Sequence, residues 1–448
     1  MFETRTPATE SMIASVLTAE LRPPLDAPQA RAEADRCLLC GLPEAPAPCV
    51  VACPADVDIP GFIEAVARDD DDAAAATVFD ANLLSGTCAR CCPVEVLCEA
   101  ACVLATEGRR PIEIGALHRY AADWGLAHPR PRREPQARRS GRVAVIGAGP
   151  GGLACAGELA ASGFSVTVYE ARNESGGLVR RAIAPYRQLN EPLPAETQLI
   201  ADLGVELRLG HPIENREALH ALQDESDAVV LAVGMGPDVA PDYPGDHLPG
   251  VWRSLHFIEQ VKAGRVTEIG RRVIVIGGGN TAVDVARIAM RLGAAEVTLV
   301  YRRGEAQMPA YAHEVSEARA EGVRLEVLTD AVRFLGSSRL TGVELRRTRL
   351  QPDAGGRPRP HALAGTEFVV PADAAITAIG QQPRSELFSW IDGLRLRDGR
   401  PEVDPATGRT SNPRYYAGGD VVNGGDTVVE AVRWGKLIAR TIAAEVGR

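Results

Sequence analysis

The chain lacks the features expected of a membrane protein or a nucleic-acid-binding protein. Its most apolar stretches, around 143–160 and 273–290, are interrupted by glycines, which favours strand–turn–helix units over membrane spans. Basic residues are in deficit: the net charge is -10 and the pI is near 5.5, which argues against nucleic acid or an anionic membrane as the main partner. No apolar stretch follows the opening Met-Phe-Glu-Thr-Arg, so we expect no signal peptide and a cytoplasmic protein.

Cysteine is scarce beyond position 102, where only Cys155 occurs, so the sequence offers no Cys-x-x-Cys for a dithiol mechanism there. The other nine cysteines lie within 37–102, in two groups that each contain a Cys-Pro. A chain of 448 residues needs no disulfide staples, and clustered thiols in a reducing compartment favour metal or redox chemistry. The spacings resemble ferredoxin-type runs, with zinc as the alternative metal.

The pattern along the chain predicts a helical N-terminal part followed by two copies of an α/β unit. Helical spacing covers 28–36 and 59–68, each with a proline in its first turn. The acidic run 69–72 is expected to be a solvated connection between helices. Residues rich in Pro and Arg at 126–141 predict an extended linker.

The first α/β copy predicts a dinucleotide site. Gly147, Gly149 and Gly152 form G-x-G-x-x-G between a predicted strand and a predicted helix, where a turn of this kind approaches a pyrophosphate. Glu170 ends the next strand, where a carboxylate accepts hydrogen bonds from a ribose hydroxyl. The alternative is a glycine-rich turn in an unrelated sheet.

The second copy predicts a site for NADPH. Gly277, Gly279 and Ala282 form the G-x-G-x-x-A variant around Asn280-Thr281, and the following strand ends in Arg302-Arg303 instead of an acid. Two guanidinium groups suit a 2′-phosphate, which favours NADPH while leaving NADH possible. The alternative is that both arginines are a solvated strand end.

Other segments resemble the two-dinucleotide flavoproteins, and this resemblance assigns the first site to FAD. The paired glycine Gly176-Gly177 follows Glu170, and Gly419-Asp420 matches the family's second flavin motif, whose aspartate holds the ribityl chain. Thr427-Val428 matches the start of a helix directed at the isoalloxazine, where a positive helix end stabilises the reduced ring. By the same resemblance, Glu314 helps shape the nicotinamide pocket.

The cysteine-rich part resembles the family of dihydropyrimidine dehydrogenase and the glutamate synthase small subunit. The matching runs are Cys37-Leu38-Leu39-Cys40, Pro48–Pro54, Cys92-Pro93 and Leu97-Cys98-Glu99, with Cys102 and Ile112–Leu117 after them. The resemblance implies two 4Fe-4S clusters. Their implied ligands are Cys37, Cys40, Cys49 and Cys102 for the first, and Cys53, Cys92, Cys98 and His118 for the second. Cys91 is expected to be a spectator and Cys88 a spare beside the cluster. An extra loop separates Cys40 from Cys49, and the alternative for His118 is an ordinary helix histidine.

The resemblance also implies the architecture. We expect two Rossmann-like, glutathione-reductase-like α/β domains preceded by an all-α iron–sulfur domain. The implied domains are a helical domain at 1–125, a linker at 126–141, an FAD-binding domain at 142–252 and 375–448, and an NAD(P)H-binding domain at 253–374.

The implied activity is transfer of electrons from NAD(P)H through FAD and iron–sulfur clusters to a catalytic partner subunit, with no catalytic acid or base in this chain. The electron-input subunit of bacterial dihydropyrimidine dehydrogenase is the branch that it resembles most, which implies a hetero-oligomer with an FMN barrel carrying a ferredoxin domain. The alternatives are the glutamate synthase small subunit with its large subunit, a ferredoxin:NADP oxidoreductase subunit, and a non-enzymatic iron–sulfur scaffold or redox sensor.

Overall fold

The computed structural model describes residues 20, 22–41, 45–128, 136–137, 139–353 and 358–446. Part of the loop between Cys40 and Cys49 (42–44) and most of the basic residues of the predicted linker (129–135 and 138) lie outside the described residues. The chain forms two units. One contains Leu21–Arg180, Asn190–Gly236 and Pro383–Arg448, and the other contains Arg181–Leu189 and Pro237–Gln382. The domain boundaries expected from the sequence stay a prediction.

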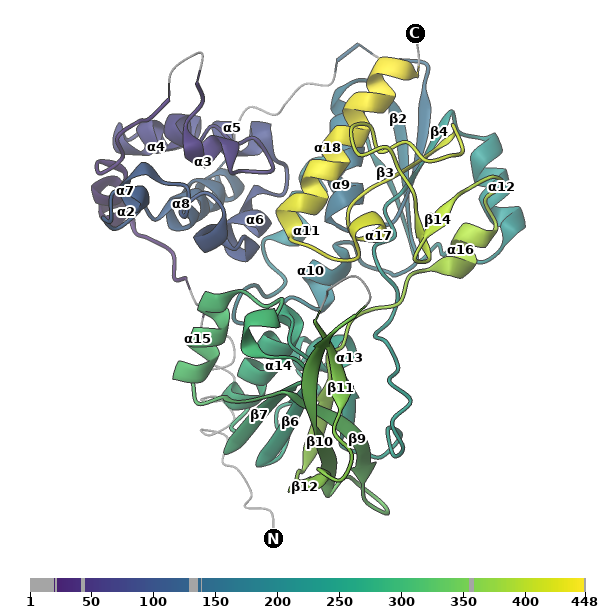
Figure 1. Ribbon diagram of the computed structural model, residues 1–448. Coiled ribbons are helices and arrows are strands. Elements are labelled where there is room, and N and C mark those ends of the chain that lie inside the picture. The colour runs from purple at the N-terminus through teal and green to yellow at the C-terminus, as the bar shows by residue number, and fades with distance from the viewer. Residues whose placement is uncertain are drawn as a thin grey trace. The chain divides into compact units, whose positions relative to one another are not determined.

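The first unit begins with a helical part that carries nine of the cysteines (Figure 1). Its helices are α2 (Ala27–Ala34), α3 (Pro48–Val51), α4 (Ile59–Ala67), α5 (Asp71–Ala81), α6 (Ser85–Cys91), the 3-10 helix η1 (Val94–Val96), α7 (Val103–Thr106) and α8 (Ile114–Ala127). The helices predicted over 28–36 and 59–68 are confirmed, and both begin with a proline in the first turn and an aspartate cap.

The acidic run 69–72 is the expected solvated connection only in part, since Asp69 and Asp70 lie exposed between α4 and α5, whereas Asp71 and Asp72 already belong to α5. Asp70 caps α5 by accepting a hydrogen bond from the backbone N–H of Ala73, and Asp71 is buried. The carboxylate of Asp71 accepts hydrogen bonds from the hydroxyl of Tyr120 and the guanidinium of Arg31. The run therefore starts a helix, because acidic side chains satisfy and stabilise free N–H groups at a helix N-terminus.

A parallel five-stranded sheet follows in the same unit, in the order β16-β4-β1-β2-β3. Its strands are β1 (Arg142–Ile146), β2 (Ser165–Glu170), β3 (Glu206–Leu209), β4 (Ala228–Leu231) and β16 (Tyr415–Ala417). The other elements of this part are α9 (Pro150–Ala161), α10 (Gly177–Arg181), α11 (Leu193–Asp202), α12 (Arg216–Asp224), α16 (Ser385–Ser389), β14 (Leu396–Arg397), β15 (Arg400–Pro401), α17 (Asp420–Asn423) and α18 (Val428–Glu445). The sheet is thus completed by a strand from near the end of the chain (Figure 1).

The second unit repeats the parallel pattern, with strand order β5-β13-β6-β7-β8, and adds an antiparallel group of strands. Its parallel part contains β5 (Val251–Arg253), α13 (Ser254–Lys262), β6 (Arg272–Ile276), α14 (Asn280–Arg291), β7 (Glu296–Tyr301), η2 (Glu305–Gln307), α15 (Ala312–Ala320), β8 (Arg324–Val327) and β13 (Ala374–Thr377). The antiparallel strands are β9 (Thr329–Leu335), β10 (Gly342–Pro352), β11 (Pro358–Ala362) and β12 (Phe368–Pro371). Two α/β dinucleotide-type folds with an N-terminal helical part make up the fold that the sequence predicts.

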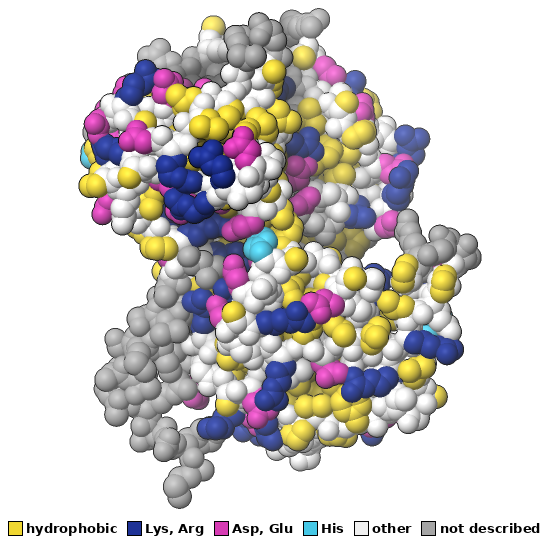
Figure 2. Space-filling view, turned by 60° about the vertical axis from the view of Figure 1, so that its left-hand side comes forward, with side chains coloured by type: hydrophobic (Ala, Val, Ile, Leu, Met, Phe, Trp, Pro, Cys, Tyr) yellow, Lys and Arg dark blue, Asp and Glu magenta, His cyan; other side chains and the backbone are white. Residues whose placement is uncertain are grey.

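On the face that Figure 2 shows, basic and acidic side chains are interspersed among hydrophobic ones. Among the described helices, none is both long and apolar enough to cross a membrane.

Candidate functional site

The turn from β1 into α9 is shaped by its glycines. Gly147 has φ +107°, and a Cβ there would lie 2.4 Å from the carbonyl oxygen of Ala232. A Cβ on Gly152 would lie 2.0 Å from the carbonyl oxygen of Gly147, so only glycine lets α9 pack this closely on the strand. Glu170 Oε2 accepts a hydrogen bond from the backbone N–H of Ala148 (2.9 Å), which places the carboxylate beside the turn.

Next to Gly149, at the N-terminus of α9, there is open space bordered by backbone atoms. A Cβ on Gly149 would meet only the Cα of Gly177, at 4.0 Å, while Gly177 has φ +54°. Two glycines therefore face each other across the N-terminus of α9, and their missing side chains leave a cradle where a pyrophosphate can approach the backbone. The residues present fit the dinucleotide that the sequence pattern predicts.

The second flavin motif is brought to this turn by α18. A Cβ on Gly435 of α18 would lie 2.4 Å from the carbonyl oxygen of Gly151, so the two helices pack through glycine. Thr427 caps α18 by accepting a hydrogen bond from the N–H of Glu430, and Val428 is the first residue of the helix. Gly419 lies directly before the short helix α17 and has a φ of +75°.

Asp420 follows Gly419 and is largely enclosed. Its Oδ1 accepts a hydrogen bond from the backbone N–H of Asp426 (3.1 Å), and burial raises the pKa of its carboxyl group to about 6. A buried carboxylate is costly to ionise unless hydrogen-bond donors stabilise it. The hydroxyl groups of a ribityl chain are donors of this kind.

The turn from β6 into α14 repeats the first geometry. A Cβ on Gly277 would lie 2.2 Å from the carbonyl oxygen of Ala378, whereas a Cβ on Gly279 would meet only Pro309, at 3.9 Å. Asn280 and Thr281 open α14, and Ala282 is fully buried against the strand. The side chain of Asn280 accepts a hydrogen bond from the backbone N–H of Tyr311 (2.9 Å), which fixes the loop that follows β7.

The two arginines after β7 differ in their surroundings. Arg302 is exposed, whereas Arg303 is half-buried and its Nε, within the described part of the chain, has no hydrogen-bond partner. A buried guanidinium donor without an acceptor is suited to an anionic ligand such as a 2′-phosphate.

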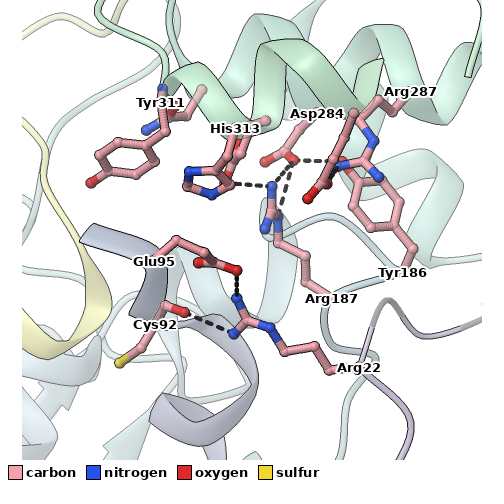
Figure 3. Close-up of polar contacts among 12 residues, drawn as sticks. Arg22, Cys92, Glu95, Tyr186, Arg187, Asp284, Arg287, Tyr311 and His313 are labelled. Carbon is pink, nitrogen blue, oxygen red and sulfur yellow. Dashed lines mark hydrogen bonds and ion pairs between the residues drawn. The ribbon is translucent and has the colours of Figure 1, made fainter. Parts of the chain in front are cut away.

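Glu314 belongs to a buried polar cluster that the sequence did not reveal. Asp284 Oδ1 accepts hydrogen bonds from the hydroxyl of Tyr186 (2.6 Å) and from Nε and Nη2 of Arg187 (3.1 and 3.0 Å), as Figure 3 shows. Arg187 also pairs with Glu314 (2.9 Å), whose pKa is raised to about 7 by burial and whose Oε2 has no partner among the described residues. The cluster joins Arg181–Leu189 to α14 and α15.

The cysteines of the helical part line two cavities. The first is lined by Cys37, Cys40, Cys49 and Cys102, together with apolar side chains such as Ile63. Burial, and then the neighbouring Cys37, raise the pKa of the Cys49 thiol to about 11. The cavity therefore brings together the four cysteines that were expected to share one cluster.

The second cavity is lined by Cys53, Cys88, Cys92, Cys98 and His118. Cys92 lies in a turn that Arg22 holds by donating to its carbonyl oxygen (3.1 Å) and by pairing with Glu95 (Figure 3). Burial lowers the pKa of His118 to about 4, so the ring is neutral and has a lone pair available to a metal. Cys91 is not among the residues that line either cavity.

The donors in both cavities fit a cluster with several irons. All ten cysteines are free thiols, and none of the described groups of three His, Cys, Asp or Glu side chains is arranged to hold a single metal ion. Four cysteines line each cavity, and cysteine thiolates are the usual ligands of iron–sulfur clusters.

Two buried polar contacts join the helical part to the flavin part of the same unit, and the sequence pattern predicted neither. Glu196 of α11 accepts hydrogen bonds from the backbone N–H (3.0 Å) and hydroxyl (2.5 Å) of Thr87 in α6. Lys436 of α18 donates to the carbonyl oxygens of Ala55 (2.5 Å) and Ala81 (2.8 Å). In the sequence, each contact is visible only as a charged residue on an otherwise apolar helix face. Such a pattern does not identify the residue with which the charge forms a hydrogen bond.

Comparison with known proteins agrees with this arrangement. Residues 141–435 match the pyridine nucleotide-disulphide oxidoreductase family, and residues 15–129 match the family described as dihydropyrimidine dehydrogenase domain II, 4Fe-4S cluster. The small chain of NADPH glutamate synthase from Halomonas elongata is 36% identical over 434 residues, which cover 93% of this chain and 91% of that protein. The beta subunit of an NADP(+)-dependent formate dehydrogenase from Moorella thermoacetica is 36% identical over 427 residues, covering 88% of this chain and 59% of that protein.

Among solved structures, FprA from Mycobacterium tuberculosis in complex with NADPH superposes with a TM-score of 0.56 at 20% identity, covering 68% of this chain and 85% of that one. This likeness concerns the fold alone. Together, the two glycine turns, the cysteine-lined cavities and the matched families show that the chain belongs to the pyridine nucleotide-disulphide oxidoreductase family, as an FAD- and NADPH-binding oxidoreductase with an N-terminal 4Fe-4S domain.

Proposed function

We propose that this chain is the electron-input subunit of a larger enzyme and passes electrons from NADPH, through FAD and two 4Fe-4S clusters, to a catalytic partner. When bound, the flavin takes a hydride from NADPH and the clusters carry single electrons. The residues of this chain hold and orient these groups. The first cavity holds one cluster and the second cavity holds the other.

One observation carries this proposal. Val429, the second residue of α18, lines the second cysteine cavity, while Thr427 and Val428 form the helix end assigned to the flavin. The same helix turn thus belongs to the flavin site and to a cluster site. Lys436 lies about two turns further along α18. Its Nζ donates a hydrogen bond to the carbonyl oxygen of Ala55, which lies two residues after Cys53. A route from flavin to cluster therefore needs no large movement within this unit.

The partner is proposed from the relatives. The glutamate synthase small chain matches over nearly the whole length of both chains, so we favour a glutamate-forming partner of the large-subunit type. Reduction of pyrimidines by an FMN-barrel partner is the second candidate, because the 4Fe-4S domain matches the family described for dihydropyrimidine dehydrogenase. A beta subunit of a formate dehydrogenase is also similar to this chain, which supports a role as one subunit of a larger enzyme.

The test uses the full chain purified without oxygen. Iron, acid-labile sulfide and flavin are measured, and NADPH is then added while the absorbance of the flavin is followed. The expected result is about eight irons and one FAD per chain, bleaching by NADPH, and an EPR signal from reduced clusters. Absence of sulfide, or a flavin that NADPH does not bleach, would contradict the proposal.

The partner is tested by copurification with each candidate subunit from the same organism. NADPH oxidation is then measured with glutamine plus 2-oxoglutarate, and separately with uracil or thymine. Activity with the amino-acid substrates supports the glutamate-forming partner, and activity with the pyrimidines supports the second candidate.

A further inference from the structure

One arginine of the antiparallel strands shares an unusual property with Arg303. The Nε of Arg346, in β10, is buried and has no hydrogen-bond partner among the residues that the structure describes. Asp330 is its cross-strand neighbour on β9, but Oδ2 of Asp330 lies 4.0 Å from Nη2 of Arg346, which is beyond hydrogen-bond distance. Because a buried donor is costly to leave unpaired, this guanidinium is suited to an anionic ligand.

Hydrogen bonds fix β10 against the chain that follows β7. The hydroxyl of Thr348 on β10 donates to the carbonyl oxygen of Arg302 (2.8 Å). The backbone N–H of Leu328 donates to the carbonyl oxygen of Arg303 (2.9 Å), and the N–H of Thr348 donates to that of Leu328 (2.8 Å). Side chains two residues apart on a strand leave the same face, so Arg346 projects from the face of β10 on which Thr348 contacts Arg302.

The hydroxyl of Tyr243 shows that Arg302 and Arg346 lie near the same point. This hydroxyl contacts Oδ1 of Asp330 at 3.5 Å. Burial and the carboxylate of Asp330 raise the pKa of Tyr243 to about 12, against the opposing effect of two nearby cations, Arg302 and Arg346. Two guanidinium groups from separate segments of the chain therefore act on one hydroxyl.

The charges around this point favour a ligand with two negative charges. Arg302, Arg303 and Arg346 are three cations, and Asp330 is the only carboxylate paired with any of them in the part of the chain that the structure describes. Positive charge is therefore in excess by two. A phosphate monoester carries a charge of about -1.5 to -2 at pH 7, which matches this excess.

We propose that Arg346 binds the 2′-phosphate of NADPH and extends the site expected at Arg302-Arg303, so that β10 contributes to the selection of NADPH over NADH. Asp330 has the opposite effect, because its carboxylate competes with the phosphate for Arg346. The inference concerns NADPH binding alone and does not depend on the clusters or on a partner subunit.

The direct test measures the binding of two adenine nucleotides that differ only in the 2′-phosphate. The dissociation constants of 2′,5′-ADP and 5′-AMP are determined by isothermal titration calorimetry with the oxidised full chain, which neither compound can reduce. Arg346→Gln is expected to weaken the binding of 2′,5′-ADP about 10-fold or more, as loss of a charge-assisted bond requires, and to leave that of 5′-AMP unchanged. No loss for 2′,5′-ADP, or an equal loss for both nucleotides, would overturn the proposal. Failure of electron transfer to a partner would not affect these constants.

Further variants separate a role in binding phosphate from a structural role. Arg333→Gln is the matched control, because Arg333 lies on β9 and its Nε is already paired with Glu344 (2.9 Å), and it is expected to change neither constant. Arg346→Lys keeps the charge and is expected to restore part of the affinity for 2′,5′-ADP. Asp330→Asn is expected to tighten 2′,5′-ADP binding, and weaker binding would contradict the competing role of Asp330. An R346Q protein that is less stable in urea and has lost affinity for both nucleotides would identify Arg346 as structural and overturn the proposal.

Discussion

Glu196 offers a sensitive test of the buried contact between the helical part and the flavin part. Its carboxyl group is completely buried in α11 and accepts two hydrogen bonds from Thr87 of α6. Burial raises the pKa of this group from 4.5 to about 7. We predict that Glu196→Gln removes a pH-dependent loss of stability, because glutamine does not ionise and its amide can still pair with the N–H and hydroxyl of Thr87.

The sign follows from proton binding. Between pH 4.5 and about 7, Glu196 is protonated in the folded chain and ionised in the unfolded one. Because the folded state binds the extra proton, the free energy of unfolding of the parent falls as the pH rises through this range. A pKa raised from 4.5 to about 7 corresponds to about 3 kcal/mol in total. Of this, about 2 kcal/mol is lost between pH 5.5 and pH 8.

The measurement is urea-induced unfolding of the cofactor-loaded protein, followed by circular dichroism at several pH values between 5.5 and 8. The free energy of unfolding of the parent minus that of E196Q is expected to fall by about 2 kcal/mol over this range. Glu217→Gln, at an exposed position in the first turn of α12, is the control and is expected to give a flat difference. An E196Q difference that is flat, or that rises with pH, would refute the reasoning.

Three further predictions concern the nucleotide sites and the second buried contact. Arg303→Ala is expected to raise the KM for NADPH about 10- to 100-fold and to leave the KM for NADH unchanged, because its buried Nε has no partner among the described residues and a charge-assisted bond to phosphate is worth about 1.5–3 kcal/mol; equal changes for both coenzymes would contradict this. Gly177→Ala places a methyl group 3.0 Å from the Cα of Gly149, at a φ of +54°, and is expected to lower the ratio of FAD to protein after purification, whereas Gly204→Ala, also at positive φ but with open space around it, keeps that ratio. Lys436→Met leaves two buried carbonyl oxygens without a donor and is expected to lower the free energy of unfolding by about 2–4 kcal/mol in urea titrations at pH 7; an unchanged value would show that these oxygens find other donors.

The sequence predicted those parts of the structure that depend on local constraints. The glycines of the two turns are required by neighbouring backbone, so a short motif was enough to predict the turns before α9 and α14. The helix that begins after Thr427 was also expected, because Thr427-Val428 matches the start of a helix in the flavoprotein motif. The division of the cysteines between two clusters was predicted only from the resemblance to the family of dihydropyrimidine dehydrogenase and the glutamate synthase small subunit.

The contacts that the sequence did not predict connect residues far apart in the chain. Glu196 and Thr87 are 109 residues apart, and Lys436 and Ala55 are 381 residues apart. A periodic pattern indicates which face of a helix is buried but does not identify what that face meets. Ser85 lies at the start of α6, where a serine is usually a cap, but its hydroxyl contacts the ring of His118, 33 residues away.

The position of β16 affects how the protein is made on the ribosome. The cysteines of both cavities have been translated once residue 102 is added, whereas β16, which completes the first sheet, begins at Tyr415. At about 5–20 residues per second, roughly 15 to 60 s of synthesis separates these two events. During that interval the thiols are available to the iron–sulfur assembly machinery while the flavin sheet still lacks a strand. Cluster insertion can therefore precede flavin binding in the growing chain.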